Sequence, residues 1–322
     1  MTRKHTTVAS AKKQPPGAGS SASVQTLSVT IVTLDNHLSS TVDRAQHTLQ
    51  KQLPGLRLTL HAAARWAEDP KALQRCIRDI NQADIVIANM LFMEEQIEPV
   101  LAALQARRNR CDAMICLLAA PEVCQLTHMG SLDMSKPQGA GMAWLKKLRG
   151  RSSGANGKGP SGNGEKQMAM LRRLPQLLRF IPGTAQDLRL YFLCMQYWLL
   201  GSDANIGNMV RMLAARYSAE RVGKAFSAKK VPAPIQYPDN GIYHPALENG
   251  ITVTPADLPQ PAAKRGRVGL IVMRSYVLAG NTNHYDGVIA AFEALDLAVV
   301  PVFASGLDCR PAINEFLVDN GS

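Results

Sequence analysis

Residues 84–118, DIVIANMLFMEEQIEPVLAALQARRNRCDAMICLL, contain two apolar runs that flank a helical pattern and so predict a strand, a helix and a second strand. The first run ends at Met90, the helical spacing covers residues 94–108, and the second run starts at Asp112. The same alternation extends upstream through two more units. Their strands are predicted at 27–34 and 56–61, and their helices at 37–52 and 69–81.

Strands that alternate with helices predict a parallel sheet with helices on both faces. The sequence therefore predicts an N-terminal α/β domain of the flavodoxin-like kind over residues 27–133. Asp69 followed by Pro70 is typical of a helix start. Ligands of such sheets bind outside the carboxyl ends of the strands. Polar residues there are common in any α/β domain, and here they are Asp35, Asn36, His37, Asn89 and Glu122.

Residues 134–230 change character, because strand signals disappear and helical patterns follow one another. The patterns lie at 134–148, 165–180, 185–200 and 204–217. Thr184 is expected as the N-cap of the third helix, with Asp187 completing a capping box. This helix carries the aromatic residues Tyr191, Phe192, Tyr197 and Trp198. They could stack on a flat macrocycle, but the apolar stripe of the helix favours packing in a core.

A Gly-rich stretch at residues 150–164 predicts a flexible loop inside this helical segment. Gly157-Lys158 invites comparison with a phosphate-binding loop. The motif would need Gly at Ser152 and Ser or Thr at Gly159, so no nucleotide site is predicted.

Residues 231–266 are rich in proline and are expected to be a linker. Residues 267–322 then start a second α/β domain, with strands at 267–273 and 297–303 and helices after each. Two strands and two helices rarely bury a stable core. We therefore expect this second domain to be truncated and the chain to be the N-terminal part of something larger.

The net charge of +11 belongs to a basic tail at residues 1–26 and to residues 146–173, and the rest of the chain is neutral. A nucleic-acid surface needs its charge on a structured face, so nucleic acid is not an expected partner. The tail is predicted to be disordered and has no secretory signal. No apolar stretch has the length of a membrane span, so an integral membrane protein is not expected. The six cysteines lie mostly in apolar runs, as in proteins of a reducing compartment.

Catalytic motifs are scarce. Cys124 and His128 are spaced i and i+4 on a predicted helix, but two ligands do not make a metal site, and no metal is expected. The best polar group is His284, Tyr285 and Asp286, which lie between a strand end and a helix start. They could receive an anion or a propionate there, or simply cap the helix.

Several long motifs resemble the large (H) subunit of magnesium chelatase. They are IPGTAQDLRLYFLCMQYWLLGS at residues 181–202, LRRLPQLLRF before it, NHYDGVI at residues 283–289, and FASGLDCRPAI at residues 303–313. The resemblance runs from residue 27 to the last residue, which is roughly the first quarter of that family's chain. No catalytic residue can be transferred onto these positions.

The resemblance implies a porphyrin-binding subunit for ATP-dependent insertion of Mg2+ into protoporphyrin IX, in chlorophyll and bacteriochlorophyll synthesis. It also implies two partner subunits of the AAA+ type that hydrolyse the ATP, and a cytoplasmic location, or the plastid stroma if the basic tail is a transit peptide. This chain alone would be inactive. The alternatives are the large subunit of cobaltochelatase, and a non-catalytic module that binds a tetrapyrrole or a partner.

Overall fold

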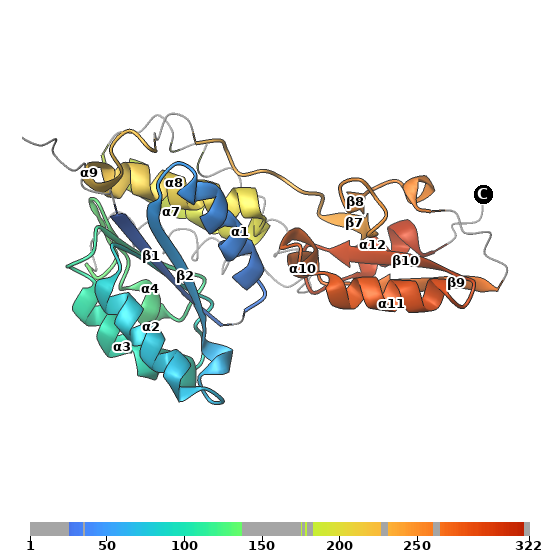
Figure 1. Cartoon of the computed structure of the whole chain (residues 1–322), viewed down its shortest axis with the longest axis horizontal. Helices are drawn as coiled ribbons and strands as arrows, with labels where there is room; N and C mark the ends of the chain where they lie inside the picture. Colours follow the sequence, from blue (N-terminus) through green and yellow to red (C-terminus); the bar gives the residue numbers. More distant parts are fainter. Residues whose placement is uncertain are drawn as a thin grey trace, which may run out of the picture.

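The computed structural model describes residues 26–34, 36–136, 175, 178, 183–226, 231–259 and 265–318. They form two lobes, one made of the described residues between 26 and 226 and one of those between 240 and 318, which lie side by side and are joined by an extended connection (Figure 1). The basic tail, the Gly-rich loop and almost all of the predicted helices at 134–148 and 165–180 lie outside the described residues. Within the described ranges, no helix is long and apolar enough to cross a membrane.

The first lobe is built on a sheet whose four long strands are parallel, as the alternation of the sequence predicts. These strands are β1 (Thr26–Thr33), β2 (Gly55–Ala62), β3 (Ile85–Asn89) and β4 (Ala113–Leu117), in the spatial order β2-β1-β3-β4. Every residue of β3 and β4 is buried, because helices cover both faces. The α/β fold class is confirmed, and the strand order is that of flavodoxin-like sheets.

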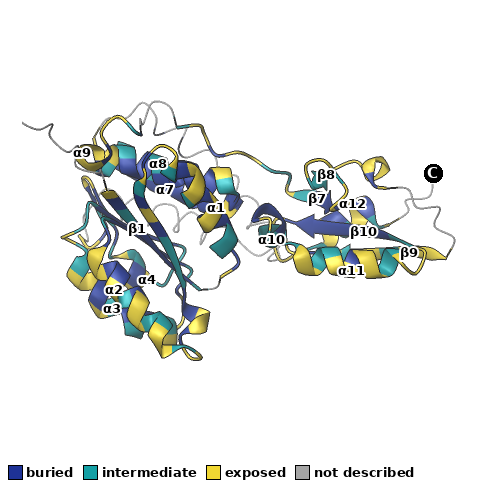
Figure 2. Cartoon of the chain, viewed as in Figure 1, coloured by how far each residue is buried: buried dark blue, intermediate teal, exposed yellow. Residues whose placement is uncertain are grey.

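Helices cover both faces of this sheet in the described part of the chain, and their buried sides face it (Figure 2). One face is covered by α1 (Ser39–Gln50), α7 (Thr184–Leu200) and α8 (Asp203–Tyr217), and the other by α2 (Pro70–Gln82) and α3 (Glu94–Arg107). Helix α2 starts as predicted, because the Asp69 carboxylate accepts a hydrogen bond from the Lys71 N–H at 3.0 Å. Helices α7 and α8 share a core with α1 and the sheet. The proposed domain boundary at residue 133 thus separates segments that pack together.

The segment after β4 differs from the prediction. Helix α4 (Pro121–Cys124) is a single turn, and a small hairpin follows it, made of β5 (His128–Met129) and β6 (Leu132–Asp133). The Thr127 hydroxyl bonds with the backbone N–H and C=O of Cys116, and this draws the chain against the edge of β4. The expectation that Cys124 and His128 share one helix is therefore wrong.

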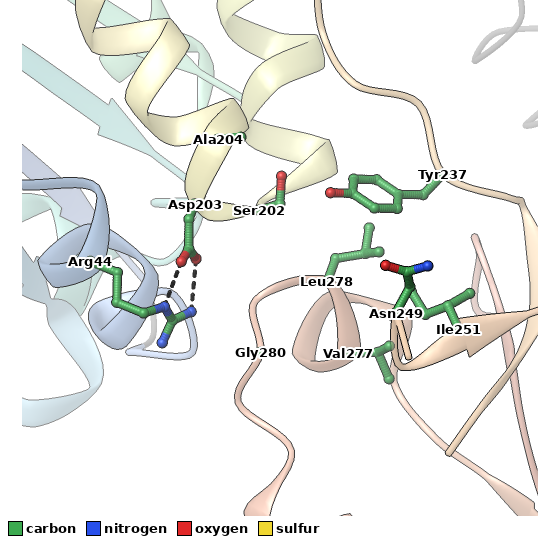
Figure 3. Close-up of a pocket in the computed structure, with 10 residues that line it drawn as sticks. All are labelled: Arg44, Ser202, Asp203, Ala204, Tyr237, Asn249, Ile251, Val277, Leu278 and Gly280. Carbon is green, nitrogen blue, oxygen red and sulfur yellow. Dashed lines mark hydrogen bonds and ion pairs between the residues drawn. The ribbon is translucent and has the colours of Figure 1, made fainter. Parts of the chain in front are cut away.

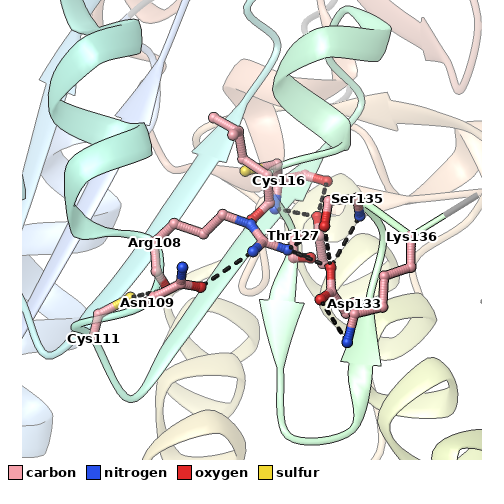
Figure 4. A network of polar contacts seen from close by, with 9 residues as sticks. Arg108, Asn109, Cys111, Cys116, Thr127, Asp133, Ser135 and Lys136 are labelled. Atoms are coloured by element: carbon pink, nitrogen blue, oxygen red, sulfur yellow. Dashed lines mark hydrogen bonds and ion pairs between the residues drawn. The ribbon is translucent and has the colours of Figure 1, made fainter.

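Arg108, just after α3, fastens this hairpin (Figure 4). Its Nε donates to the Leu126 carbonyl at 3.0 Å, and its Nη2 donates to the Asp133 carboxylate. Burial alone would raise the pKa of Asp133. Hydrogen bonds from Ser135 and Arg108 outweigh burial and hold this pKa well below the ordinary value of 3.8.

Helix α7 starts differently from the prediction as well. Its N-cap is Gly183, which has a φ of +78°, and Thr184 is the first helical residue and makes no capping bond. Asp187 does not cap the helix. Its buried carboxylate instead accepts hydrogen bonds from Ser131 and from the Tyr217 hydroxyl, which are stronger partners inside the lobe.

All four aromatic residues of α7 are buried in the core, as the apolar stripe favoured. Tyr191 also donates its hydroxyl hydrogen to the Cys116 carbonyl at 3.0 Å. A short helix, α9 (Ala219–Val222), ends this part of the lobe. These aromatic side chains stabilise the lobe and leave no flat face open to a macrocycle.

The second lobe has a four-stranded sheet in the order β8-β7-β10-β9. Two of its strands, β9 (Gly266–Ile271) and β10 (Leu297–Ala304), were predicted and are parallel. The other two, β7 (Asn240–Tyr243) and β8 (Ile251–Thr252), come from the Pro-rich stretch and are antiparallel to their neighbours. The expectation of only two strands is therefore wrong. The helices are α10 (Arg274–Leu278), α11 (Asn283–Glu293) and α12 (Arg310–Phe316).

Candidate functional site at the seam between the lobes

The structure brings two groups of predicted site residues together at the seam between the lobes. The His37 ring, after β1, lies 5.7 Å from the Tyr276 ring of α10, measured between centroids. The Tyr276 ring lies 5.4 Å from that of His284, and the His284 ring lies 3.9 Å from the Tyr285 ring, tilted by 43°. A chain of four aromatic rings thus connects the carboxyl end of β1 to the start of α11.

The three residues at the start of α11 have different surroundings. His284 is exposed, whereas the Tyr285 hydroxyl accepts a hydrogen bond from the Met273 N–H at 3.0 Å. The Asp286 carboxylate accepts hydrogen bonds from the Tyr243 hydroxyl and from Thr282. Burial and this bond to Asp286 raise the pKa of Tyr243 to about 12. Tyr285 and Asp286 thus hold α11 to its own lobe, and His284 is the member that faces outward.

Arg44 of α1 joins three elements at the seam. Its guanidinium makes a two-pronged ion pair with Asp203 of α8, at 2.6 and 2.8 Å, and it also donates to the Ala279 carbonyl of the second lobe at 2.7 Å. The same carbonyl accepts a bond from the Thr41 hydroxyl at 2.8 Å. The bond to Asp203 raises the pKa of Arg44 above its ordinary value, so Arg44 stays charged. Thr41 and Arg44 lie within one turn of α1, and their bonds to the Ala279 carbonyl cross the seam.

A pocket of about 470 Å³ opens beside Arg44 (Figure 3). The first lobe contributes the start of α8, the connection contributes Tyr237, and the second lobe contributes α10 and the β8 region. The polar lining residues are Arg44, Ser202, Asp203, Tyr237 and Asn249, and the apolar ones include Ile251, Val277 and Leu278. A pocket with one charged pair, three uncharged polar groups and an apolar wall suits the edge of a ligand that is partly polar and partly apolar.

The other residues at the carboxyl ends of the strands do not join this pocket. Asn89 is buried and accepts a hydrogen bond from the Thr33 hydroxyl at 2.9 Å, Glu122 is exposed on α4, and Asp35 lies outside the described residues. Among the residues that the structure describes, no three His, Cys, Asp or Glu side chains lie close enough to hold a metal ion.

The six cysteines all fall within the described ranges and are free thiols. Burial raises the pKa of the Cys76 thiol to about 12 and that of Cys111 to about 11. Both thiols therefore stay protonated at neutral pH, and they act as small apolar side chains.

Sequence reasoning missed the residues that fasten the seam. Arg44 and Asp203 are 159 positions apart, and Arg44 and Ala279 are 235 apart. Each looks like an ordinary residue of an exposed helix face or a turn. The one local signal is that Thr41 and Arg44 are spaced i and i+3 and so share a face of α1.

Comparison with protein families gives two matches that together span most of the chain. Residues 28–192 match the family described as Domain of unknown function (DUF3479), and residues 195–322 match CobN/Magnesium Chelatase. The division between them falls inside α7.

Similar proteins include the magnesium-chelatase H subunit of Cereibacter sphaeroides, which is 53% identical over 91% of this chain and 24% of its own length. That of Rhodobacter capsulatus is 47% identical over 90% of this chain and 24% of its own length. The chloroplastic ChlH protein of magnesium chelatase from Oryza sativa subsp. indica is 28% identical over 95% of this chain and 22% of its own length. The chain spans about a quarter of the length of these relatives.

A solved structure described as the catalytic subunit of cobaltochelatase from Mycobacterium tuberculosis covers 86% of this chain and 16% of that chain, with 12% identity and a TM-score of 0.38. A TM-score this low does not establish a shared fold. The family model that matches residues 28–192 covers about half of the chain, so the chain belongs to the family described as Domain of unknown function (DUF3479), and it is similar to magnesium-chelatase H subunits over about a quarter of their length.

Proposed function

We propose that this chain belongs to the porphyrin-binding subunit of magnesium chelatase, which inserts Mg2+ into protoporphyrin IX in an ATP-dependent reaction of bacteriochlorophyll or chlorophyll synthesis. The observation that carries the proposal is the 53% identity to a magnesium-chelatase H subunit across 91% of the chain. We assign ATP hydrolysis to two AAA+ partner subunits. We place the protein in the cytoplasm, because its most similar relatives named above are bacterial.

Metal insertion needs groups that strip water from Mg2+ and accept two pyrrole protons. We assign these groups to the part of the H subunit that this chain does not span. The chain itself is assigned a binding role at the seam, where polar groups and an apolar wall meet. Mixed with both partner subunits, Mg2+, ATP and protoporphyrin IX, the chain alone should form no magnesium porphyrin.

Within this proposal His284 contacts the ligand, and Tyr285 and Asp286 hold its helix in place. The support is that His284 is exposed and its ring contacts two tyrosine rings, whereas the other two side chains bond inside the lobe. An imidazole in that position can bond a propionate at the rim of a porphyrin.

The test uses a chimaeric subunit in which this chain replaces the matching quarter of the Cereibacter sphaeroides relative. Fluorescence quenching would measure its Kd for protoporphyrin IX and, in parallel, for a metal-free corrin precursor. We expect the porphyrin to bind more tightly. Tighter binding of the corrin would support the cobaltochelatase alternative and contradict the proposal.

Two variants of the chimaera test the role of His284. His284→Ala should raise the Kd for protoporphyrin IX about threefold to tenfold, which is the effect of losing one hydrogen bond to a charged group. His47→Ala is the control, because His47 is exposed on α1 and bonds only within its helix. Equal Kd values for both variants would remove His284 from the proposal and leave the family assignment intact.

A further inference from the structure

Strand β9 is an edge of the second sheet in the described part of the chain. Its single strand partner there is β10, and its residues alternate between exposed and half-buried. Ile271 is 51% exposed, and Met273, just after the strand, is 54% exposed. A free edge with apolar side chains is a site at which another strand can pair.

The direction of hydrogen bonding in β9 can be read from Val272. Its N–H donates to the Val302 carbonyl of β10 at 2.9 Å. Successive backbone groups of a strand point to opposite sides, so the N–H groups of Ile271 and Gly269 point away from β10, toward the free edge. They are positioned to bond a further strand.

The two helices that follow β9 and β10 lie on opposite faces of this sheet. Helix α11 packs through Ile289 on Val299, and α12 packs through Phe316 on Val300 and Val302. Crossovers between parallel strands are right-handed almost without exception. The crossover through α11 leads from β9 to its neighbour β10. A right-handed crossover on the opposite face of a sheet moves in the opposite direction across it. A crossover through α12 must therefore lead from β10 back across β9, to the free edge of β9.

The first lobe shows the completed form of this arrangement. There α1 packs on one face and α2 on the other, and the strand after α2 pairs with the free edge of β1, which gives the order β2-β1-β3. The order of elements in the first lobe is β1, α1, β2 and α2, and the second lobe has the same order in β9, α11, β10 and α12. Both edges of β10 are taken, by β7 and β9, so the corresponding next strand can pair only with β9.

We propose that the free edge of β9 is the docking edge for a parallel strand from the part of the chain that follows α12 in the longer relatives. This chain spans 24% of the Cereibacter sphaeroides relative, so the remaining part of that relative is long enough to provide the additional strand. The second lobe would then have the order β8-β7-β10-β9 followed by the new strand. The inference rests on topology and family membership and does not depend on chelatase activity.

Hydrogen exchange of the chimaera and of the 322-residue chain tests this directly. We expect the amides of Gly269 and Ile271 to exchange at least about tenfold more slowly in the chimaera. The amide of Val272, already bonded to β10, is the internal reference. Equally fast exchange of the edge amides in both proteins would overturn the proposal.

Two separate proline substitutions in β9 provide an independent test. Ile271→Pro removes an outward N–H and should leave the melting temperature of the 322-residue chain within about 2 °C, but lower that of the chimaera's second lobe by about 4 °C or more. Leu270→Pro, which removes an inward N–H, should destabilise both proteins. If Ile271→Pro is tolerated equally in both, or if the 322-residue chain is already a dimer with protected edge amides, the occupant is not the downstream chain and the proposal fails.

Discussion

Asp187 is a buried carboxylate that joins several elements of the first lobe. It is 2% exposed, and its carboxylate accepts bonds from the Ser131 N–H and hydroxyl at 2.8 and 2.7 Å and from the Tyr217 hydroxyl at 2.8 Å. The hydrogen bond from Tyr217 joins α8 to this group, and those from Ser131 join the β5–β6 hairpin. Burial and the nearby carboxylate raise the pKa of Tyr217 far above its ordinary value, so it remains a donor.

Asp187→Ala should therefore reduce the free energy of unfolding by about 3 kcal/mol, because the buried carboxylate is the shared acceptor of three partly buried hydrogen bonds. The measurement is urea unfolding followed by circular dichroism. Asp308→Ala is the matched control, since Asp308 is exposed and pairs with Arg310 two positions away, and it should leave the free energy of unfolding almost unchanged. Similar losses for both variants would contradict the anchoring role of Asp187.

His61 gives the first lobe a dependence on pH. Burial lowers its pKa below the ordinary 6.5, although the hydrogen bond to Asp79 at 3.0 Å partly opposes this. The unfolded chain then binds the proton more tightly than the folded one. The stability from neutral His61 is full above pH 6.5 and is lost as the pH falls below that value toward the folded pKa.

His61→Gln should accordingly flatten the fall in unfolding free energy between about pH 7 and about pH 5. Denaturant titrations at several pH values measure this slope. His47→Gln, on the exposed side of α1, is the control for the replacement of a histidine. A slope that stays the same in His61→Gln would show that His61 titrates alike in both states.

At the scale of elements, the long strands and helices of both lobes were predictable, because apolar β-branched runs and helical spacing are local signals. The short strands β5 to β8 were not. Two to four residues carry no periodicity, and such strands exist only because a neighbouring edge accepts them. The start of α7 was mispredicted for a similar reason: Asp187 has distant partners that outcompete the local capping box.

Substitution of two glycines by alanine tests the assigned boundaries of α7 and α11. Gly201 ends α7 with a φ of +42°, and a Cβ there would lie 3.2 Å from the Leu38 side chain, whereas Gly287 lies inside α11 with open space around it. Gly201→Ala should cost about 1 kcal/mol or more, and Gly287→Ala should stabilise by about 0.5–1 kcal/mol. Thermal unfolding would show the opposite signs, and equal signs would contradict these helix boundaries.

At the scale of the whole molecule, the aromatic chain and the bonds from Arg44 join the lobes. None of these could be predicted, because the partners are far apart in the sequence, 235 positions in the case of Arg44 and Ala279. Of the candidate site, the sequence identified His37 and His284, but only the structure shows that Tyr276 lies between them.

Arg44→Ala should loosen the seam without unfolding either lobe, because the Arg44–Asp203 pair is partly exposed and such pairs contribute at most about 1 kcal/mol. Small-angle X-ray scattering should show a broader distribution of distances between the lobes, with an unchanged melting temperature. Arg310→Ala is the control, because Arg310 pairs with Asp308, which is only two positions away in the sequence. An unchanged scattering curve for Arg44→Ala would show that other contacts fix the lobes.

The most direct test of the central claim is metal insertion by the chimaeric protein, with both AAA+ partners, ATP and protoporphyrin IX, and with Mg2+ or Co2+ supplied in separate reactions. Fluorescence of the product would be followed over time. The proposed function predicts magnesium protoporphyrin at a rate within about tenfold of the unmodified relative, which corresponds to a barrier change below about 1.4 kcal/mol. A folded chimaera that assembles with its partners but forms no magnesium protoporphyrin would contradict it.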